Sequence, residues 1–386
     1  MDSILFIILL QNYKYILTVN QTELFYTICL TLLPGIGNVR GKKLITVCGS
    51  AEAVFNENKK TLSKIPGFGT FTVQDISLLN VSKNAEEEIN IIEKYKIIPL
   101  LFNSPLYPDR LKHCEDGPLL LYSKGNTNFN FPKVIGIVGT RKATSYGKKY
   151  CTEIVKQLAS PDILIVSGLA LGIDGCAHEA AIENNITTVG ILAHGLNIIY
   201  PPSHKQLAIQ MLKNGALITE FSFYTKPDKE NFPQRNRIIA GMSDAILVIE
   251  TGLKGGALIT AEFANSYNRD VFALPGRVND FYSQGCNRLI RNNKAALVES
   301  ADDIKYIMGW DDNKSNNIKN IQQDIPINLN DDEKQIVDLL QINGESSIDF
   351  ICLSCGMTNS KIASILLNLE FQGIVKSLPG NRFILN

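Results

Sequence analysis

The 386-residue chain is 45% hydrophobic and 20% charged, and its 38 basic side chains balance 38 acidic ones, so its formal net charge is zero. This length and composition indicate a globular protein of two or three domains. Zero net charge excludes a protein that is basic over its whole surface, so any surface that binds a polyanion must be a local patch. Eight cysteines without a paired framework are typical of reduced thiols, and we expect a cytoplasmic protein.

Two short motifs could be mistaken for a membrane span and for a zinc or redox site. The apolar run at residues 4–10 is far shorter than the roughly 20 residues of a membrane span, and no basic flank or cleavage site accompanies it. We interpret it as a helix, a strand or the result of a misassigned start codon, and expect no membrane attachment. Cys352 and Cys355 form a CxxC without a second pair, so we interpret them as small buried hydrophobic residues rather than a zinc or redox site.

Residues 20–100 are predicted to form a helical domain with two similar turns. The sequence Leu-Pro-Gly-Ile-Gly occupies residues 33–37, and Ile-Pro-Gly-Phe-Gly occupies residues 65–69. Such a segment ends one helix and opens another whose free N–H groups can hold a phosphate, as in a helix-hairpin-helix (SAM-like) domain. A plain pair of packed helices explains the same pattern. Because Lys42 and Lys43 follow only the first turn, contact with DNA here stays open.

Residues 101–310 alternate short runs of Val, Ile and Leu with amphipathic stretches. Runs of this kind are too short for most helices and predict strands buried on both faces. The series predicts βαβ units and a Rossmann-like, doubly wound parallel sheet in an α/β domain, with the ligand beyond the carboxyl ends of the strands at a topological switch point. The predicted strands are Val134–Val138, Ile163–Val166, Thr188–Leu192, Ala216–Ile218, Ala245–Ile249 and Val271–Leu274.

Familiar catalytic and cofactor motifs are missing from this region. The first predicted strand is followed by neither a G-x-G-x-x-G turn for a dinucleotide nor a Walker loop for a nucleoside triphosphate. The sequence also lacks a G-x-S-x-G elbow, an H-E-x-x-H zinc site and a clustered acid pair. His178 lies on an apolar-leaning helix, which predicts a structural histidine. We therefore expect no enzyme activity, no metal and no organic cofactor.

Residues 231–262 place cations and an aromatic ring close to paired glycines. Arg235 and Arg237 supply positive charge for a phosphate backbone. An alternative is that the two arginines are surface charges or partners of Glu220 and Glu250.

The paired glycines complete this predicted surface. Gly255 and Gly256 lack Cβ atoms, so their N–H groups can approach an anion closely. A helix predicted to start near Ala257 adds its positive N-terminal end. Since the glycines follow the buried strand Ala245–Ile249, we expect them to face the ligand. The segment therefore predicts a surface that binds a phosphate backbone.

The end of the chain predicts a linker and a small third domain. Residues 311–330 are rich in Asn and Asp and favour a linker, whereas residues 331–386 contain three helical patterns and a β-hairpin, which resemble a winged helix. DNA reading requires basic residues on the third helix, but only Lys361 is there, so protein docking or packing is favoured. The predicted helices are Glu333–Leu340, Ile348–Cys355 and Asn359–Phe371.

Six ordered motifs in the middle region resemble the DNA-processing protein A (DprA/Smf) family. The flanking domains agree, because members of this family often carry an N-terminal helical domain with hairpin turns and a C-terminal winged-helix-like domain. The resemblance thus covers nearly the whole chain. The motifs are Gly139-Thr-Arg141, Ser167-Gly-Leu-Ala-Leu-Gly-Ile-Asp174 with His178, Gly195-Leu-Asn-Ile-Ile-Tyr-Pro201, Phe232-Pro-Gln-Arg-Asn-Arg-Ile-Ile239, Gly255-Gly-Ala-Leu-Ile-Thr260 and Phe272-Ala-Leu-Pro-Gly276.

By this resemblance the chain binds single-stranded DNA, acts as a homodimer and loads the RecA recombinase onto incoming strands during natural transformation. Arg141 would neutralise a phosphate, and Phe232, unless it is a core residue, would stack on a base. Phosphates give affinity, and an aromatic ring accepts any base for about 1–3 kcal/mol. The implied DNA-binding residues are Arg141, Ser167, Gly168, Lys229, Phe232, Arg235, Asn236, Arg237, Lys254, Gly255, Gly256 and Thr260.

The glycine loop departs from the family's pattern and supports a second hypothesis. Residues 254–258 read Lys-Gly-Gly-Ala-Leu where many relatives have Ser-Gly-Ser-Leu, which keeps small residues and adds a cation. With Thr260 and Glu262, the loop also resembles that of the lysine-decarboxylase-like nucleotide phosphoribohydrolases, where a glutamate and an arginine help to cleave an N-glycosidic bond. The proline before the glycines is missing, the spacing to Thr260 differs, and the flanking domains have no place in that small enzyme.

Overall fold

The computed structural model describes residues 20–68, 76–125, 128–310, 329–378 and 382–385. The chain divides into two compact units, residues 1–311 and 312–386. The apolar run at residues 4–10 and most of the predicted linker lie outside the described residues. No helix in the described part of the chain is long and apolar enough to cross a membrane.

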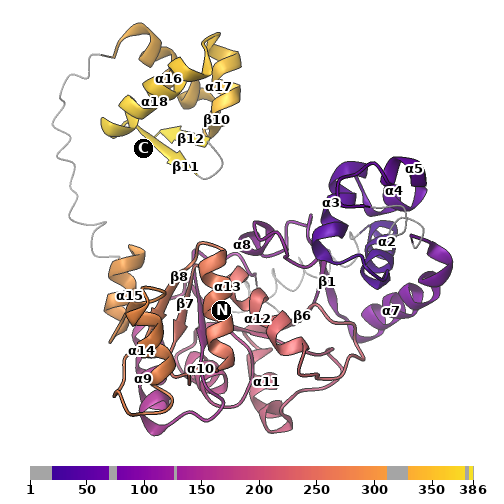
Figure 1. The fold of residues 1–386 in the computed structure, drawn as a ribbon, viewed down its shortest axis with the longest axis vertical. Coiled ribbons are helices and arrows are strands. Elements are labelled where there is room, and N and C mark those ends of the chain that lie inside the picture. The colour runs from indigo at the N-terminus through magenta and orange to yellow at the C-terminus, as the bar shows by residue number, and fades with distance from the viewer. Residues whose placement is uncertain (1–19, 69–75, 126–127, 311–328, 379–381, 386) are drawn as a thin grey trace. The chain divides into compact units, whose positions relative to one another are not determined.

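The first unit is built on a nine-stranded sheet in the order β1-β2-β6-β5-β4-β3-β7-β8-β9. Two of its parallel neighbours, β7 and β8, lie side by side in Figure 1. Strands β3 to β9 pair in parallel, whereas β1 and β2 are antiparallel at one edge. The chain winds from β3 out to β6 and returns to the other side of β3 with β7, which makes the sheet Rossmann-like and doubly wound. The strands are β1 Ile98–Leu101, β2 Leu120–Gly125, β3 Lys133–Val138, β4 Ile163–Ser167, β5 Thr187–Ile191, β6 Gly215–Thr219, β7 Ala245–Val248, β8 Asp270–Ala273 and β9 Ala296–Leu297.

The sequence patterns predict the parallel core of this sheet but not its edges. Each predicted strand is present, with ends that agree within one residue. Strands β1, β2 and β9 were not predicted. The predicted domain boundary between residues 100 and 101 falls inside β1, which pairs Leu100 with Leu121 of β2. This pairing is non-local, so the short apolar run at β1 does not reveal it.

Helices cover both faces of the sheet, as the alternation of side chains along β3 shows. Ile135 and Ile137 pack with α9, α10 and α15 on one face, whereas Val134 and Val138 pack with α12, α13 and α14 on the other. Helix α11 packs against β5 and β6. The helices are α8 Asp109–Lys112, α9 Ser145–Gln157, α10 Ile173–Glu183, η2 Pro202–His204, α11 Lys205–Met211, α12 Asn231–Met242, α13 Gly256–Ser266, α14 Gln284–Arg291 and α15 Ala301–Met308.

A helical subdomain precedes the sheet and contains the first predicted hairpin turn. Gly35, with φ +74°, lies in the turn between α2 and α3. The lysines that follow are engaged within the protein, because the ammonium of Lys42 donates to Cys114 O at 2.9 Å and that of Lys43 to Pro66 O at 2.6 Å. The continuation of the second turn lies outside the described residues. The helices are α2 Gln21–Leu32, α3 Asn38–Cys48, α4 Ala51–Asn56, α5 Lys59–Leu62, η1 Leu78–Asn80 and α7 Ser82–Tyr95.

The second unit is the predicted winged helix. Its three helices pack on one apolar cluster, which Cys352 and Cys355 help to line. Lys361, on the third helix, pairs with Asp332 at 2.6 Å. Its elements are α16 Asp331–Asn343, β10 Ser346–Ser347, α17 Ile348–Cys355, α18 Asn359–Phe371, β11 Val375–Leu378 and β12 Arg382–Leu385.

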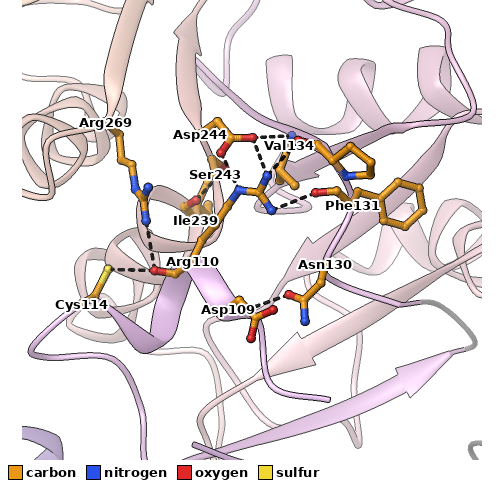
Figure 2. A network of polar contacts seen from close by, with 11 residues as sticks. Asp109, Arg110, Cys114, Asn130, Phe131, Val134, Ile239, Ser243, Asp244 and Arg269 are labelled. Atoms are coloured by element: carbon orange, nitrogen blue, oxygen red, sulfur yellow. Dashed lines mark hydrogen bonds and ion pairs between the residues drawn. The ribbon is translucent and has the colours of Figure 1, made fainter. Parts of the chain in front are cut away.

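An ion pair fixes the segment around α8 to the sheet (Figure 2). Arg110 binds both carboxylate oxygens of Asp244, through Nε at 2.5 Å and Nη2 at 2.8 Å. The same carboxylate accepts the N–H of Val134, at 2.8 Å, and Arg110 also donates to Phe131 O. Because Asp244 directly precedes β7 and Val134 lies in β3, this network holds the beginnings of two neighbouring central strands together.

We expect Asp244→Ala to lower the free energy of unfolding by about 2–3 kcal/mol, because it leaves a part-buried guanidinium and a strand N–H unpaired. Urea unfolding followed by circular dichroism measures the change. Glu153→Ala is the control: it removes an exposed pair with Lys149, 3.8 Å apart, and should cost no more than about 0.5 kcal/mol. Equal effects of the two substitutions would contradict the structural role of Asp244.

Candidate nucleic-acid interface

A cavity of about 400 Å³ opens where the winding of the sheet reverses. Its walls come from the loops after β3 and β7 and from the first turns of α12 and α13. Strand β3 lies between β4 and β7, so the loops that follow it and β7 diverge to opposite faces of the sheet. Such a switch point is where open α/β sheets bind ligands. The cavity therefore lies where the sequence placed the ligand.

The structure brings most of the predicted binding residues together. Gly168 does not line this cavity but lines a slot that adjoins it. Ser167, Lys229 and Arg237 line neither. The predicted residues that line the cavity are Arg141, Phe232, Arg235, Asn236, Lys254, Gly255, Gly256 and Thr260.

Helix α12 presents one of the cavity's walls. Phe232, Arg235 and Asn236 are three and four residues apart, so they lie on one face of the helix. Pro233 fits in the first turn, where its missing N–H removes no intrahelical hydrogen bond. The amide of Asn236 donates to Gly256 O at 3.3 Å, which ties α12 to the start of α13.

Arg235 forms the floor of the cavity. Its side chain is almost wholly buried, with the residue 5% exposed, and its guanidinium donates to Ile191 O at the end of β5. Burial lowers the Arg235 pKa to about 10, whereas nearby Asp174 favours the charged form. Burial in turn raises the Asp174 pKa, and Arg235 opposes that shift. A Cβ at Gly168 would overlap both the guanidinium and the carboxylate, so glycine makes room for this pair of charges.

Arg141 and Phe232 form the cavity's cation–aromatic wall. The guanidinium carbon of Arg141 lies 4.6 Å from the centroid of the Phe232 ring, within the range of a cation–π contact. Tyr200 approaches the same ring, with centroids 6.2 Å apart. Phe232 is only half-buried, so it is not a fully buried core residue, but part of its ring is already covered.

The glycine loop opens the N-terminal end of α13 toward the cavity. Gly255 is the N-cap and Gly256 the first residue of the helix, where backbone N–H groups lack intrahelical partners. A Cβ at Gly256 would meet nothing within 4 Å, so that position is open. Lys254 is exposed on the rim, whereas Thr260 is buried. Partial positive charge and a lysine thus converge at this end of the cavity.

The side chain of Arg237 does not line the cavity but forms contacts within the protein. It pairs with Glu220 and donates to Asp116 O at 2.5 Å. Glu220 also accepts from Asn38, which begins α3, at 3.4 Å, so this cluster joins α12 to the helical subdomain. Of the alternatives stated for the arginines, pairing with Glu220 therefore describes Arg237. The predicted contact of Arg237 with DNA stays a prediction that its placement outside the cavity does not favour.

Ser167 and Glu250 are also engaged inside the protein. The Ser167 hydroxyl is buried and donates to Ile137 O at 2.5 Å. Glu250 pairs with neither arginine; its carboxylate accepts from the N–H of Thr144 at 2.9 Å and from its hydroxyl at 2.5 Å. Neither residue lines the cavity; both stabilise the loops around it.

Two residues that line the cavity were given no binding role from the sequence. Asp174 was named only as the last residue of a motif, but its carboxylate accepts from Ala170 N at 3.3 Å and lies beside Arg235. Phe281 lies in an irregular loop after β8, where no periodic pattern could single it out. Only the charge and aromatic character of these side chains offered a signal.

His178 is a structural histidine, as predicted. It is fully buried on α10, and its Nδ1 lies 2.7 Å from the Thr188 hydroxyl. Burial is the main cause that lowers its pKa to about 3. The neutral imidazole is therefore part of the fold.

Comparisons with known proteins agree with the fold. The family described as DNA recombination-mediator protein A matches residues 99–309, and the DprA winged helix domain matches residues 322–381. The chain belongs to the DprA/Smf family. It is 43% identical to the DNA processing protein DprA of Bacillus subtilis over 203 residues, covering 52% of this chain and 68% of that one. It is 32% identical to Protein Smf of Escherichia coli over 308 residues, covering 77% and 80%.

Solved structures of family members share the fold. The structure of DprA from Streptococcus pneumoniae matches with a TM-score of 0.64 at 30% identity, over 74% of this chain and 97% of that one. DprA from Helicobacter pylori matches with a TM-score of 0.51 at 28% identity, over 56% and 96%. The Helicobacter pylori structure addresses the single-stranded DNA binding mode of that protein.

We expect Gly168→Ala to destabilise the protein by about 1–3 kcal/mol, because the added methyl group displaces the buried charges of Arg235 and Asp174. Gly256→Ala, in open space at a helix start, serves as the control for stability and should change it by no more than about 0.5 kcal/mol. Thermal unfolding of both variants measures the difference. A Gly168→Ala protein as stable as the wild type would show that the pair does not constrain this position.

Acidification should weaken the fold through His178. In the unfolded chain the histidine has its ordinary pKa of 6.5, whereas in the folded protein its pKa is about 3. Between these two values only the unfolded state binds the proton, so the free energy of unfolding decreases as the pH falls from about 6.5 to about 3. The unfolding penalty of His178→Gln should therefore shrink by about 1.4 kcal/mol per pH unit between roughly pH 6 and pH 4. Urea unfolding of both proteins at several pH values measures it. A penalty independent of pH would contradict the buried neutral state.

Proposed function

We propose that this chain binds single-stranded DNA in the cavity at the switch point and presents it for recombination. The observation that carries the proposal is the convergence of Arg141, Lys254 and the start of α13 with the ring of Phe232 on one cavity. Phosphates bind cations and helix N-termini, whereas bases stack on aromatic rings. The reported single-stranded DNA binding of the Helicobacter pylori relative supports the same ligand.

The charged side chains of the cavity have two different roles: some stabilise the structure of the site, and others contact the DNA strand. Lys254 is exposed and free to follow a phosphate, whereas Arg235 is buried and fixes the floor. Arg141 can serve both roles, since its guanidinium packs on the ring of Phe232 and the residue is also exposed to solvent. In a duplex, stacking between neighbouring base pairs covers the faces of the bases, so a site that combines phosphate contacts with an aromatic stacking ring favours a single strand.

The wider role is an inference from family membership. We infer that the protein acts as a homodimer, that it protects incoming single strands and that it loads RecA onto them during natural transformation. The support for this inference is the match of both family domains in one chain. For the winged helix, we favour protein docking or packing over DNA reading, because Lys361 is already paired with Asp332.

The nucleotide phosphoribohydrolase hypothesis loses support from the geometry. Its candidate acid, Glu262, does not line the cavity that holds Arg235. It lines a separate cleft on the other side of Lys254 and Gly255. Glu262 therefore does not share a cavity with Arg235, the arginine of the switch-point cavity, although Arg288 lines the same cleft as Glu262.

We expect the double variant Arg141→Ala, Lys254→Ala to bind oligo-dT much more weakly and with a flatter salt dependence. Each lost phosphate contact on a single strand should reduce the slope of log K against log salt by about 0.7, so the double variant should lose roughly 1.4. Fluorescence anisotropy of a labelled oligomer over a salt series, with a duplex of the same length beside it, measures both effects.

The matched control is Arg291→Ala, Lys213→Ala, which removes the same two residue types from exposed positions outside the cavity. This control should retain nearly the wild-type affinity and slope. If both double variants lose affinity equally, the attraction is general and the cavity is not the binding site.

A further inference from the structure

Phe281 is an exposed aromatic side chain in the loop between β8 and α14. It is 64% exposed, yet it lines the same cavity as Arg141 and Phe232. Single exposed apolar side chains are common on protein surfaces and need no explanation by themselves. An exposed ring on the wall of a cavity that also holds cations has the features of a stacking platform for nucleic-acid bases.

The loop that carries Phe281 is held in place at both ends. Asn287 and Gly276 exchange two hydrogen bonds, from the Gly276 N–H to the Asn287 amide oxygen at 3.2 Å and from the amide nitrogen to Gly276 O at 2.9 Å. Next to the ring, the N–H of Thr251 donates to Tyr282 O at 2.6 Å. Little ordering of the loop is therefore required before a base can stack there.

The surroundings of the ring support one side and leave most of it open. A Cβ at Gly252 would lie 3.0 Å from the ring, so the ring rests against the glycine backbone. Tyr282 meets it edge to face, with centroids 5.0 Å apart and planes at 89°. The ring is thus oriented by two neighbours without being covered by them.

Phe232, the stacking residue expected from the sequence, is less accessible. Arg141 lies 4.6 Å above its ring, and Tyr200 approaches from 6.2 Å. A base that stacks on Phe232 must use the remaining surface or displace the guanidinium. Phe281 has no cation over its ring among the described residues.

We propose that Phe281 is a second base-stacking residue of the site. A single strand that crosses the cavity then places one base against Phe232 and another against Phe281, while Arg141 and Lys254 contact its phosphates. The inference rests on the proposed function and adds a residue that selects unpaired bases. It gives a function to an exposed aromatic side chain that lines the same cavity as Arg141 and Lys254.

The test is the binding of oligo-dT to full-length Phe281→Ala, Phe281→Leu and Phe281→Tyr proteins. Loss of the ring should weaken binding about tenfold in the alanine and leucine variants, and tyrosine should restore it, because stacking requires an aromatic face. The slope of log K against log salt should not change, since stacking releases few counterions. Tyr224→Ala, which removes a 61% exposed ring outside the cavity, is the control and should bind like the wild type.

An oligomer of abasic residues separates stacking from other effects. Wild type and Phe281→Ala should bind this oligomer equally, because no base is present to stack. The proposal is overturned if Phe281→Ala binds oligo-dT as well as the wild type does, or if leucine restores binding as fully as tyrosine. Failure of the proposed function looks different: in that case the Arg141→Ala, Lys254→Ala protein also binds oligo-dT as well as the wild type.

Discussion

The buried guanidinium of Arg235 is the constraint on which the site depends. A charge can lie in the interior only when hydrogen bonds and an opposite charge compensate it, and here Ile191 O and Asp174 do so. This arrangement requires a glycine at position 168, because a side chain there would overlap both charges. The end of β5, the loop after β4 and the first turns of α12 are therefore fixed relative to one another before any ligand arrives.

The groups that meet a strand are arranged on this fixed floor. Arg141 and Lys254 are exposed at the cavity, and the N-terminal end of α13 adds partial positive charge between its walls. Because the floor charge is buried and the rim charges are exposed, loss of Arg235 should act mainly through the shape of the site. Loss of the rim charges should act directly on phosphate binding.

The sequence predicted what short-range patterns control. The βαβ series located every parallel strand from β3 to β8, because strands buried on both faces form continuous apolar runs. The sequence offered pairing with Glu220 as an alternative for Arg237 but could not decide it, since this pair depends on how α12 meets the helical subdomain. Phe281 was missed for the same reason: its loop has no periodicity, and only the folded chain brings it to the cavity.

The most direct test of where the strand lies is photo-crosslinking of an oligonucleotide that carries 5-iodouracil, followed by mass spectrometry of the digested full-length protein. Iodouracil crosslinks efficiently to aromatic side chains that it stacks on. We predict crosslinks to Phe232 and Phe281, both on the wall of the switch-point cavity. Crosslinks confined to the hairpin turn at residues 33–37 or to the winged helix, with none at the cavity, would contradict it.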